Sequence, residues 1–480
     1  MVRLVHALPV KSPSVRAVLR RRGRAALILA LASAAFGAPI QAPGATPRIL
    51  VGPNVLVSKA WPKLFHAELW AAADPKHNGR LILASMASDP DTVDERSIVY
   101  VSSDHGRSWS ARLVTGDHSE DPATAFGPDG SAYFLHLNGV AGGVELYRSA
   151  DGGDHWSAPT PAPFMDRPYL AVSPSGTLFV DGHVRPPQDS RSFVFSLMTA
   201  PAGKGFSPIL TLPQSIAGGI TPGEGAFLSD GTYVAVVESL TNLAALNSTA
   251  VQKQLGWVGV VTSTDGGQSL QPPLRAADWW NATGVDYLSN LPHIAIDASA
   301  GKYRDRIYLT WSDTRSGRSE IWLTWSGDRG QTWSPANRVN DDVSPPGPGP
   351  DHLQPAIAVN NRGVVGVSWY DRRDAKDDRG WRTRFSASLD GGVTFMPSVA
   401  ASQSAYTPSL SRPATMNEPL ERVMKNTGEV THHPRWSFAY IGGDTGTIAA
   451  SADGAFHLFW PDNRTGVMQV WTAEARVGVQ

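Results

Sequence analysis

Short runs of apolar residues recur along the whole chain, and turn residues separate each run from the next. The runs 123–126 and 131–135, for example, flank the turn Pro128-Asp129-Gly130. Similar turns stand at Pro174-Ser175-Gly176, Ser229-Asp230-Gly231, Asn361-Arg362-Gly363 and Ala452-Asp453-Gly454, and longer ones at 75–79 and 298–302. Short apolar runs joined by such turns are typical of β-hairpins. The pattern therefore predicts many short antiparallel strands.

The paired runs divide the chain into seven units, which lie near residues 65, 121, 167, 223, 292, 354 and 446. Units of about 40–60 residues with four short antiparallel strands are typical of propeller blades. One unit alone cannot bury its own faces, so such units stack side by side in a ring. We therefore expect an all-β protein, a β-propeller of about seven four-stranded blades, with a six-bladed ring as the alternative.

An octapeptide, Ser-x-Asp-x-Gly-x-x-aromatic, recurs within these units. It stands at 102–109, 149–156, 326–333 and 388–395, a copy at 263–270 ends in Leu270, and Thr199, Gly203 and Phe206 belong to a worn copy. The Ser and Asp oxygens accept hydrogen bonds from the backbone of a tight turn, and Gly adopts the positive φ that such a turn needs. Each copy follows an apolar run. We therefore expect a structural turn between the third and fourth strands of each unit.

The last unit contains runs near 447–450, 456–459 and 467–473, and then the chain ends without room for a fourth strand. A ring left open at this point would expose the edges of its sheets. The segment 48–58 has the apolar residues Ile49, Leu50, Val55 and Val57 and belongs to no other unit. We expect this N-terminal segment to pair as the outer strand of the last blade and to close the ring.

The octapeptide resembles the Asp box, or BNR repeat, of sialidases. The chain as a whole looks like secreted bacterial BNR-repeat proteins that are described as sialidase-like. This resemblance implies a sialidase-like β-propeller whose ligand is a glycan or an acidic sugar. It also implies a glycoside hydrolase as one function of the chain.

The sequence departs from the sialidase pattern at several points. Sialidases have six blades, whereas seven units are counted here. Their Arg-Ile-Pro motif has no full counterpart: Arg48-Ile49-Leu50 lacks the proline, and Arg167-Pro168 is a partial match in the third unit. The sialidase set of a Tyr nucleophile, a Glu, an Asp and three Arg residues has no residue-by-residue match.

The N-terminus has the pattern of a secretory signal. A basic stretch, 16–24, precedes the apolar run 25–36, and Ala35-Phe36-Gly37 fits a cleavage site. We expect a signal peptide at 1–38, a linker at 39–47 and a single propeller domain at 48–480; a single membrane anchor is the alternative to the signal peptide. The expected location is outside the cytoplasm, either periplasmic or extracellular, with no later membrane segment.

Composition excludes several classes of function. The formal net charge of −1 gives no electrostatic support for binding nucleic acid. The absence of cysteine excludes disulfides, thiol chemistry and Cys-ligated metals. The pair His432-His433 has no third ligand, so we expect no metal and no cofactor. We expect a monomer.

The motif Trp-x-Asp-x-Arg recurs at the ends of the second strands of the last three units. Its polar members are Asp313 and Arg315, Asp371 and Arg373, and Asp462 and Arg464. Residues two apart in an extended segment lie on the same side, so each Asp and Arg can pair. The motif is either a repeated ion pair or a substrate-binding rim of Arg forks and aromatic faces.

Further polar residues precede the first strand of each unit, where ligands bind in propellers. They are Glu68, Glu120, Asp121, Asp166, Arg167, Glu224, His293, Asp351, His352 and Asp444. If the ring closes, these side chains converge on a central funnel, where paired carboxylates serve glycoside cleavage. The catalytic candidates are Asp444, Glu224, Tyr440 and Asp121, and the binding candidates of this group are Arg167, Asp166 and His352. Solvated funnel residues without a catalytic role are the alternative.

A long insertion, 405–433, precedes the last unit and is a candidate lid. The sequence leaves two functions open. One is an exported glycan-active hydrolase, and the other is a non-catalytic propeller that binds carbohydrate or protein.

Overall fold

Eight antiparallel sheets lie in the described part of the chain: six have four strands in chain order, one has five strands and one has two. The computed structural model describes residues 47–89, 95–116, 118–184, 194–201, 204–212, 220–240, 254–280, 291–343, 350–374, 380–406, 420–423, 430–433, 442–443 and 445–478. The predicted signal peptide, 1–38, and the linker 39–47 except Pro47 lie outside these residues.

The first three blades contain residues from the N-terminal half of the chain. Blade 1 has β3 (Phe65–Ala73), β4 (Leu81–Ser88), β5 (Glu95–Ser102) and β6 (Ser110–Val114). Blade 2 has β7 (Ser119–Phe126), β8 (Ala132–Asn138), β9 (Gly143–Ser149) and β10 (Thr160–Ala162). Blade 3 has β11 (Asp166–Val172), β12 (Leu178–Val184), β13 (Val194–Ala200) and β14 (Leu210–Thr211).

The next three blades repeat this order. Blade 4 has β15 (Ile220–Phe227), β16 (Tyr233–Leu240), β17 (Gln254–Ser263) and β18 (Leu274–Trp280). Blade 5 has β19 (His293–Ile296), β20 (Ile307–Asp313), β21 (Glu320–Ser326) and β22 (Asn337–Arg338). Blade 6 has β23 (His352–Val359), β24 (Val365–Asp371), β25 (Arg382–Ser388) and β26 (Val399–Ala400).

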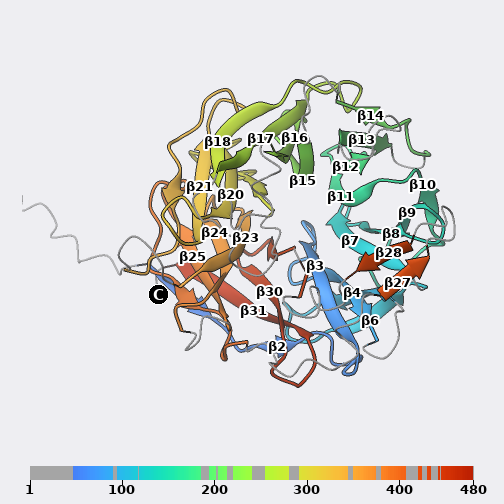
Figure 1. The fold of residues 1–480 in the computed structure, drawn as a ribbon, viewed down its shortest axis with the longest axis horizontal. Helices are drawn as coiled ribbons and strands as arrows, with labels where there is room; N and C mark the ends of the chain where they lie inside the picture. Colours follow the sequence, from blue (N-terminus) through green and yellow to red (C-terminus); the bar gives the residue numbers. More distant parts are fainter. Residues whose placement is uncertain are drawn as a thin grey trace, which may run out of the picture. The chain divides into compact units, whose positions relative to one another are not determined.

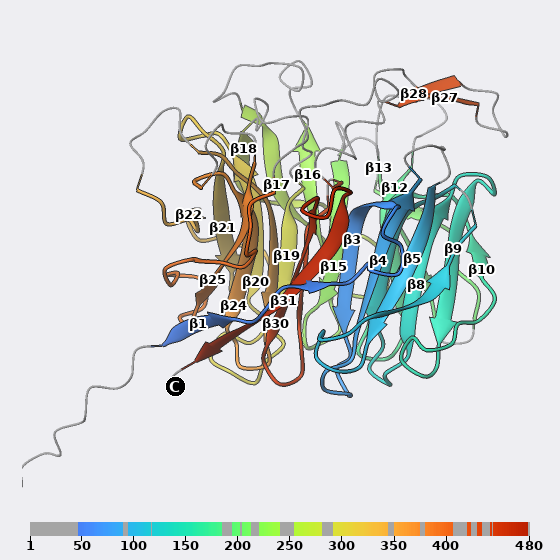
Figure 2. The ribbon, with the colours of Figure 1, turned by 90° about the horizontal axis from the view of Figure 1, so that it is seen from below.

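Blade 7 combines both ends of the described chain. Its inner strands are β29 (Thr447–Ala450), β30 (Phe456–Asp462) and β31 (Gln469–Gly478), and its outer strand consists of β1 (Arg48–Val51) and β2 (Val55–Leu56). β1 runs along β31, as Figure 2 shows. The two strands are antiparallel, with Arg48 opposite Gly478 and Val51 opposite Ala475. The expected closure of the ring by the N-terminal strand is confirmed.

The innermost strands of the blades contact one another in the order β3, β7, β11, β15, β19, β23 and β29, and β29 contacts β3 again. Figure 1 shows the labelled inner strands β3, β7, β11, β15 and β23 around a common centre. The seven-bladed propeller is therefore confirmed, and the six-bladed alternative is wrong. The described part of the chain contains no helix long and apolar enough to cross a membrane.

Each octapeptide forms a turn between the third and fourth strands of its blade. In blade 5 the Ser326 hydroxyl donates to Asp328, and the Gly330 amide donates to Ser326 Oγ, both at 2.8 Å. Thr332 donates to Asp328 from its hydroxyl and its amide, and these bonds lower the pKa of Asp328 to about 2. The Trp333 indole N–H donates to the Gly330 carbonyl at 2.9 Å. The expected structural turn is present.

The glycine at the fifth position of the octapeptide packs against the preceding blade. At Gly267 of blade 4, φ is 85°, and a Cβ atom would lie 2.5 Å from Thr199 Cγ2 and 3.0 Å from Phe179 of blade 3. Its neighbour Gly266 has a φ of 74° but nothing within 4 Å of a Cβ atom. The interface between two blades is here called a seam. Of these two neighbouring glycines, only Gly267 is close-packed in the seam.

This pair of glycines gives a matched test of seam packing. Gly266→Ala adds only the strain of a left-handed backbone and should lower the free energy of unfolding by about 1 kcal/mol. Gly267→Ala adds overpacking of the seam as well and should lower it by about 2 kcal/mol. Urea unfolding of both variants measures the difference. Equal losses would show that the seam tolerates the extra methyl group.

The predicted insertion, 405–433, has only part of its length among the described residues. Trp381 and Tyr406 form an isolated antiparallel bridge. Farther along, β27 (Leu420–Val423) pairs with β28 (Val430–His433) as a separate two-stranded sheet. The role of this insertion as a lid stays a prediction.

Candidate functional site

The innermost strands of five blades contain a β-bulge near their first residues. The bulges lie in β3, β7, β11, β15 and β23. In four of these strands a polar residue at the bulge has a left-handed backbone: φ is 50° at Glu68, 48° at Asp121, 50° at Arg167 and 44° at Gln354. Each such residue costs about 1–2 kcal/mol. A bulge re-aims the side chain it carries, so these polar groups leave the regular alternation of the strand.

A pocket lies against the innermost strands of the first three blades. It is lined by Glu68, Trp70, Asp121, Pro122, Ala123, Arg167, Pro168, Tyr169, Leu291 and Thr445. Three of the four left-handed polar residues are therefore in its wall. Leu291 precedes β19 and Thr445 precedes β29, so the pocket combines segments from five of the seven blade positions.

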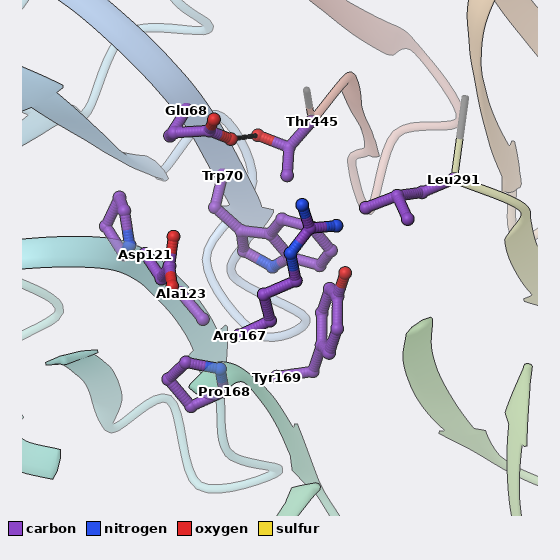
Figure 3. Close-up of a pocket in the computed structure, with 10 residues that line it drawn as sticks. Glu68, Trp70, Asp121, Ala123, Arg167, Pro168, Tyr169, Leu291 and Thr445 are labelled. Atoms are coloured by element: carbon purple, nitrogen blue, oxygen red, sulfur yellow. Dashed lines mark hydrogen bonds between the residues drawn. The ribbon is translucent and has the colours of Figure 1, made fainter. Parts of the chain in front are cut away.

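The pocket combines charged groups with aromatic faces. Trp70 and Tyr169 pack edge to face, with ring centroids 5.4 Å apart and planes at 61°. Figure 3 shows Glu68 and Asp121 on one side of the pocket and the guanidinium of Arg167 extending toward its middle. The Thr445 hydroxyl donates a 2.8 Å hydrogen bond to Glu68 Oε2. Two carboxyl groups, one guanidinium and two aromatic rings thus meet in one concave site.

The sequence-predicted residues divide between the pocket and other places. Asp121 and Arg167 line the pocket. Asp166 lies next to Arg167 but accepts from His183 Nε2 at 3.0 Å, outside the pocket wall. Asp444 and Tyr440 lie outside the described residues, so their predicted catalytic roles stay predictions.

Glu224 joins two blades. Its Oε2 lies 2.9 Å from His293 Nδ1, and its Oε1 accepts from the Ile294 amide at 2.9 Å. These contacts tie the inner strand of blade 4 to that of blade 5, and Glu224 is not in the wall of the pocket. Its catalytic role stays a prediction.

The Trp-x-Asp-x-Arg motifs form internal ion pairs at the ends of β20, β24 and β30. Arg315 lies 2.6 Å from Asp313 and Arg373 lies 2.9 Å from Asp371, and Arg464 pairs with Asp462. The indole N–H groups of Trp311 and Trp369 donate to the same carboxylates. The three carboxylates are at most 1% exposed. The expected pairing is present, and the substrate-binding role of these residues stays a prediction.

His352 is fully buried between two carboxylates of blades 5 and 6. Its Nε2 lies 3.0 Å from Asp342 and its Nδ1 lies 3.1 Å from Asp371. Burial alone would lower the pKa of His352, but the two carboxylates outweigh burial and raise it. His352 and Arg373 in turn lower the pKa of Asp371 to about 2, against the effect of its burial. The two carboxylates therefore favour the charged form of His352, and its predicted binding role remains untested.

Sequence reasoning missed several residues of the pocket. Glu68 was noted at the start of its unit but was not selected as a site residue, and Trp70, Tyr169 and Thr445 were not noted as candidates. The triplets Glu68-Leu69-Trp70 and Arg167-Pro168-Tyr169 share a pattern: a charged residue is followed two places later by an aromatic residue. In both triplets the charged and the aromatic residue line the pocket. Residues two apart in an extended strand lie on the same side, but no feature of a single strand tells which side faces a pocket.

No family model matches the chain, and no curated protein matches it. Solved structures do match. A Hadza microbial sialidase, Hz136, is 13% identical, covers 79% of this chain and 73% of its own, and has a TM-score of 0.43. The α-L-arabinofuranosidase Arb93A from Fusarium graminearum is 15% identical over 67% of this chain and 93% of its own, with a TM-score of 0.41. The intramolecular trans-sialidase from Ruminococcus gnavus is 11% identical over 88% and 96%, with a TM-score of 0.40.

Proposed function

We propose that this chain is an exported, sialidase-like propeller of the Asp-box type that hydrolyses glycosidic bonds in its central pocket. The observation that carries the proposal is the meeting of Glu68, Asp121 and Arg167 with the rings of Trp70 and Tyr169 in one pocket. Export is proposed from the basic stretch 16–24 and the apolar run 25–36. The place of action is the periplasm or the cell exterior.

The chemistry of the pocket matches the chemistry of a sugar. Aromatic rings offer flat apolar faces to the C–H groups of a sugar ring, and carboxylates accept hydrogen bonds from its hydroxyl groups. An Arg fork binds a carboxylate with two parallel hydrogen bonds, so Arg167 suits an acidic sugar.

Glycoside hydrolysis uses a pair of carboxyl groups. One protonates the leaving oxygen, and the other either activates a water molecule or attacks the sugar itself. Glu68 and Asp121 are the two carboxyl groups in the described wall of the pocket. We assign this pair to them. Asp444 stands in the sequence between Gly443 and Thr445, and it stays a further catalytic candidate.

One observation favours a non-catalytic glycan-binding function. Glu68 is only 3% exposed, and it already accepts a hydrogen bond from Thr445. A carboxylate held in this way serves binding geometry as well as it serves proton transfer. Binding without turnover is therefore the second candidate function.

A panel of chromogenic glycosides tests the proposal, with sialosides, uronides and arabinosides included. Turnover by the purified chain should fall by at least about 100-fold in Asp121→Asn and in Glu68→Gln. Asp154→Asn is the control, because this carboxylate is 41% exposed and pairs with Arg112 outside the pocket wall.

The outcomes separate the candidate functions. Turnover that survives both pocket substitutions would contradict the assignment of the carboxyl pair. Glycan-array binding without turnover would establish the second function instead. Neither binding nor turnover on any glycan would overturn both.

A further inference from the structure

The wall of the pocket includes the junction between the last blade and the first. Thr445 lies two residues before β29, and β29 packs beside β3 of blade 1. Two hydrogen bonds tie the backbone of β3 to this segment: the Glu68 amide donates to the Gly442 carbonyl at 3.1 Å, and the Ala71 amide donates to Thr447 Oγ1 at 3.1 Å. The entry to blade 7 therefore lies directly against the strand that carries Glu68.

The carboxylate of Glu68 is buried, and it belongs to a residue with a strained backbone. Its backbone is left-handed at the bulge, and its side chain is almost entirely removed from water. A buried carboxylate needs hydrogen-bond donors to keep its charge. Thr445 Oγ1 lies 2.8 Å from Glu68 Oε2 but 3.4 Å from the Leu69 carbonyl, so its single proton goes to the carboxylate. Figure 3 shows the two side chains facing each other.

Two glycines bring the segment close enough for this contact. A Cβ atom on Gly443 would lie 2.5 Å from the Glu68 amide nitrogen and 2.8 Å from its carboxyl carbon, and φ there is 97°. A Cβ atom on Gly442 would overlap the ring of Pro461 in β30. Gln354 of blade 6 holds the segment from the other side by donating to the Gly443 carbonyl at 2.7 Å. Gly442 and Gly443 therefore pack closely between Pro461 and Glu68.

We propose that Thr445 is a positioning residue: its hydroxyl orients the carboxylate of Glu68 in the pocket and stabilises its ionised form. The catalytic meaning of this contact rests on the proposed function, in which Glu68 belongs to the carboxyl pair. The contact itself does not depend on that function. Asp121 and Arg167 are the other charged residues in the described wall of the pocket. Burial raises the pKa of Tyr370 in β24, and the negative charge of Glu68 raises it further.

Three variants of the full chain separate positioning from plain stability. Thr445→Val keeps the shape of the side chain and removes its donor, and Thr445→Ser restores the donor. Thr447→Val is the matched control, because Thr447 also bridges blades 7 and 1 through one hydroxyl but does not contact Glu68 or line the pocket. A merely structural role predicts the same behaviour from Thr445→Val and Thr447→Val.

The first readout is the pH profile of kcat/KM on a glycoside that the chain hydrolyses. A hydrogen bond to a carboxylate favours its ionised form, so its loss makes Glu68 harder to ionise. The ionisation that disappears in Glu68→Gln should move up by about one pH unit in Thr445→Val, and kcat should fall about tenfold. Both should return in Thr445→Ser and stay unchanged in Thr447→Val.

The second readout needs no substrate. Glutamate labelled with ¹³C at its carboxyl carbon is followed by NMR during a pH titration, and Glu68 is assigned by the signal lost in Glu68→Gln. Its titration should move to higher pH in Thr445→Val only. Failure to hydrolyse any glycoside would overturn the proposed function and leave this readout intact. An unchanged Glu68 titration in Thr445→Val, or an equal shift in Thr447→Val, would overturn the positioning role.

Discussion

A chain that begins at Lys59, without β1 and β2, should lose cooperative folding and aggregate. β1 and β2 cover the outer edge of β31 by antiparallel pairing, and Gly52 and Val57 add backbone hydrogen bonds to Glu474 and Val470. Ser58 donates to Gln469 at 2.7 Å, and its own Oγ accepts from the Val470 amide. Without these residues, the strand Gln469–Gly478 has an unpaired edge that invites pairing with another chain.

The closing segment also connects blade 7 to blade 6. Asn54 donates to the Ala401 carbonyl at 2.9 Å and accepts from the Gln403 amide at 2.8 Å. The control is a chain that begins at Pro47 and keeps the strand. Circular dichroism and light scattering on heating compare the two chains, and a synthetic peptide of residues 47–58 should restore the melting transition. An unchanged transition in the shorter chain would contradict closure by this strand.

Acid should weaken the seam between blades 7 and 1 through His457. The glycine at the fifth position of four octapeptides faces an apolar or aromatic residue of the preceding blade: Ile82, Phe179, Val260 or Tyr308. Gly106 of blade 1 instead faces His457 Nδ1, at 3.5 Å from the position of a Cβ atom. Burial lowers the pKa of His457 to about 4, against the raising effect of Glu474 and Asp453. The seam therefore holds a neutral histidine where the others hold an apolar side chain or a tyrosine.

The direction of the effect follows from proton binding. Below pH 6.5 the unfolded chain protonates this histidine, whereas the folded chain does not until pH falls to about 4. Stability is therefore full above pH 6.5 and falls by about 3 kcal/mol as pH drops to 4. Asp181 acts in the opposite direction, because burial raises its pKa well above 3.8. The contribution of His457 to the pH dependence of stability is therefore measured by comparing the unchanged chain with a variant that lacks this histidine.

His457→Leu should reduce the loss of stability between pH 7.5 and pH 4 by about 3 kcal/mol relative to the unchanged chain. Urea unfolding at several pH values measures it. His155→Asn is the control, because that side chain is 90% exposed. A parallel loss in the unchanged chain and in His457→Leu would show that the seam does not respond to acid through this group.

The fold was predictable because its information is local and repeated. Turns such as Pro128-Asp129-Gly130 and the octapeptides mark the hairpins directly. The role of residues 48–58 followed from a missing strand in the last unit and from the cost of an open edge. These arguments need only short stretches of sequence and the repetition between them.

The site was predictable only in part, because it depends on contacts between blades. Asp121 and Arg167 were found from their place before an inner strand. Trp70 and Tyr169 were missed because alternation along one strand does not tell which of its faces lies against the pocket. The sequence also does not tell whether a pair such as Asp313 and Arg315 is already used internally or is open to a ligand.

The closed ring has a consequence for how the pocket is assembled. Blades 1 to 3 supply most of its wall, whereas Thr445 comes from the entry to blade 7. β1 in turn finds its partner only in β31 of the same last blade. A chain in which blade 7 has not yet docked therefore has an incomplete pocket. The wall of the pocket and the last seam both depend on one event, the closure of the ring.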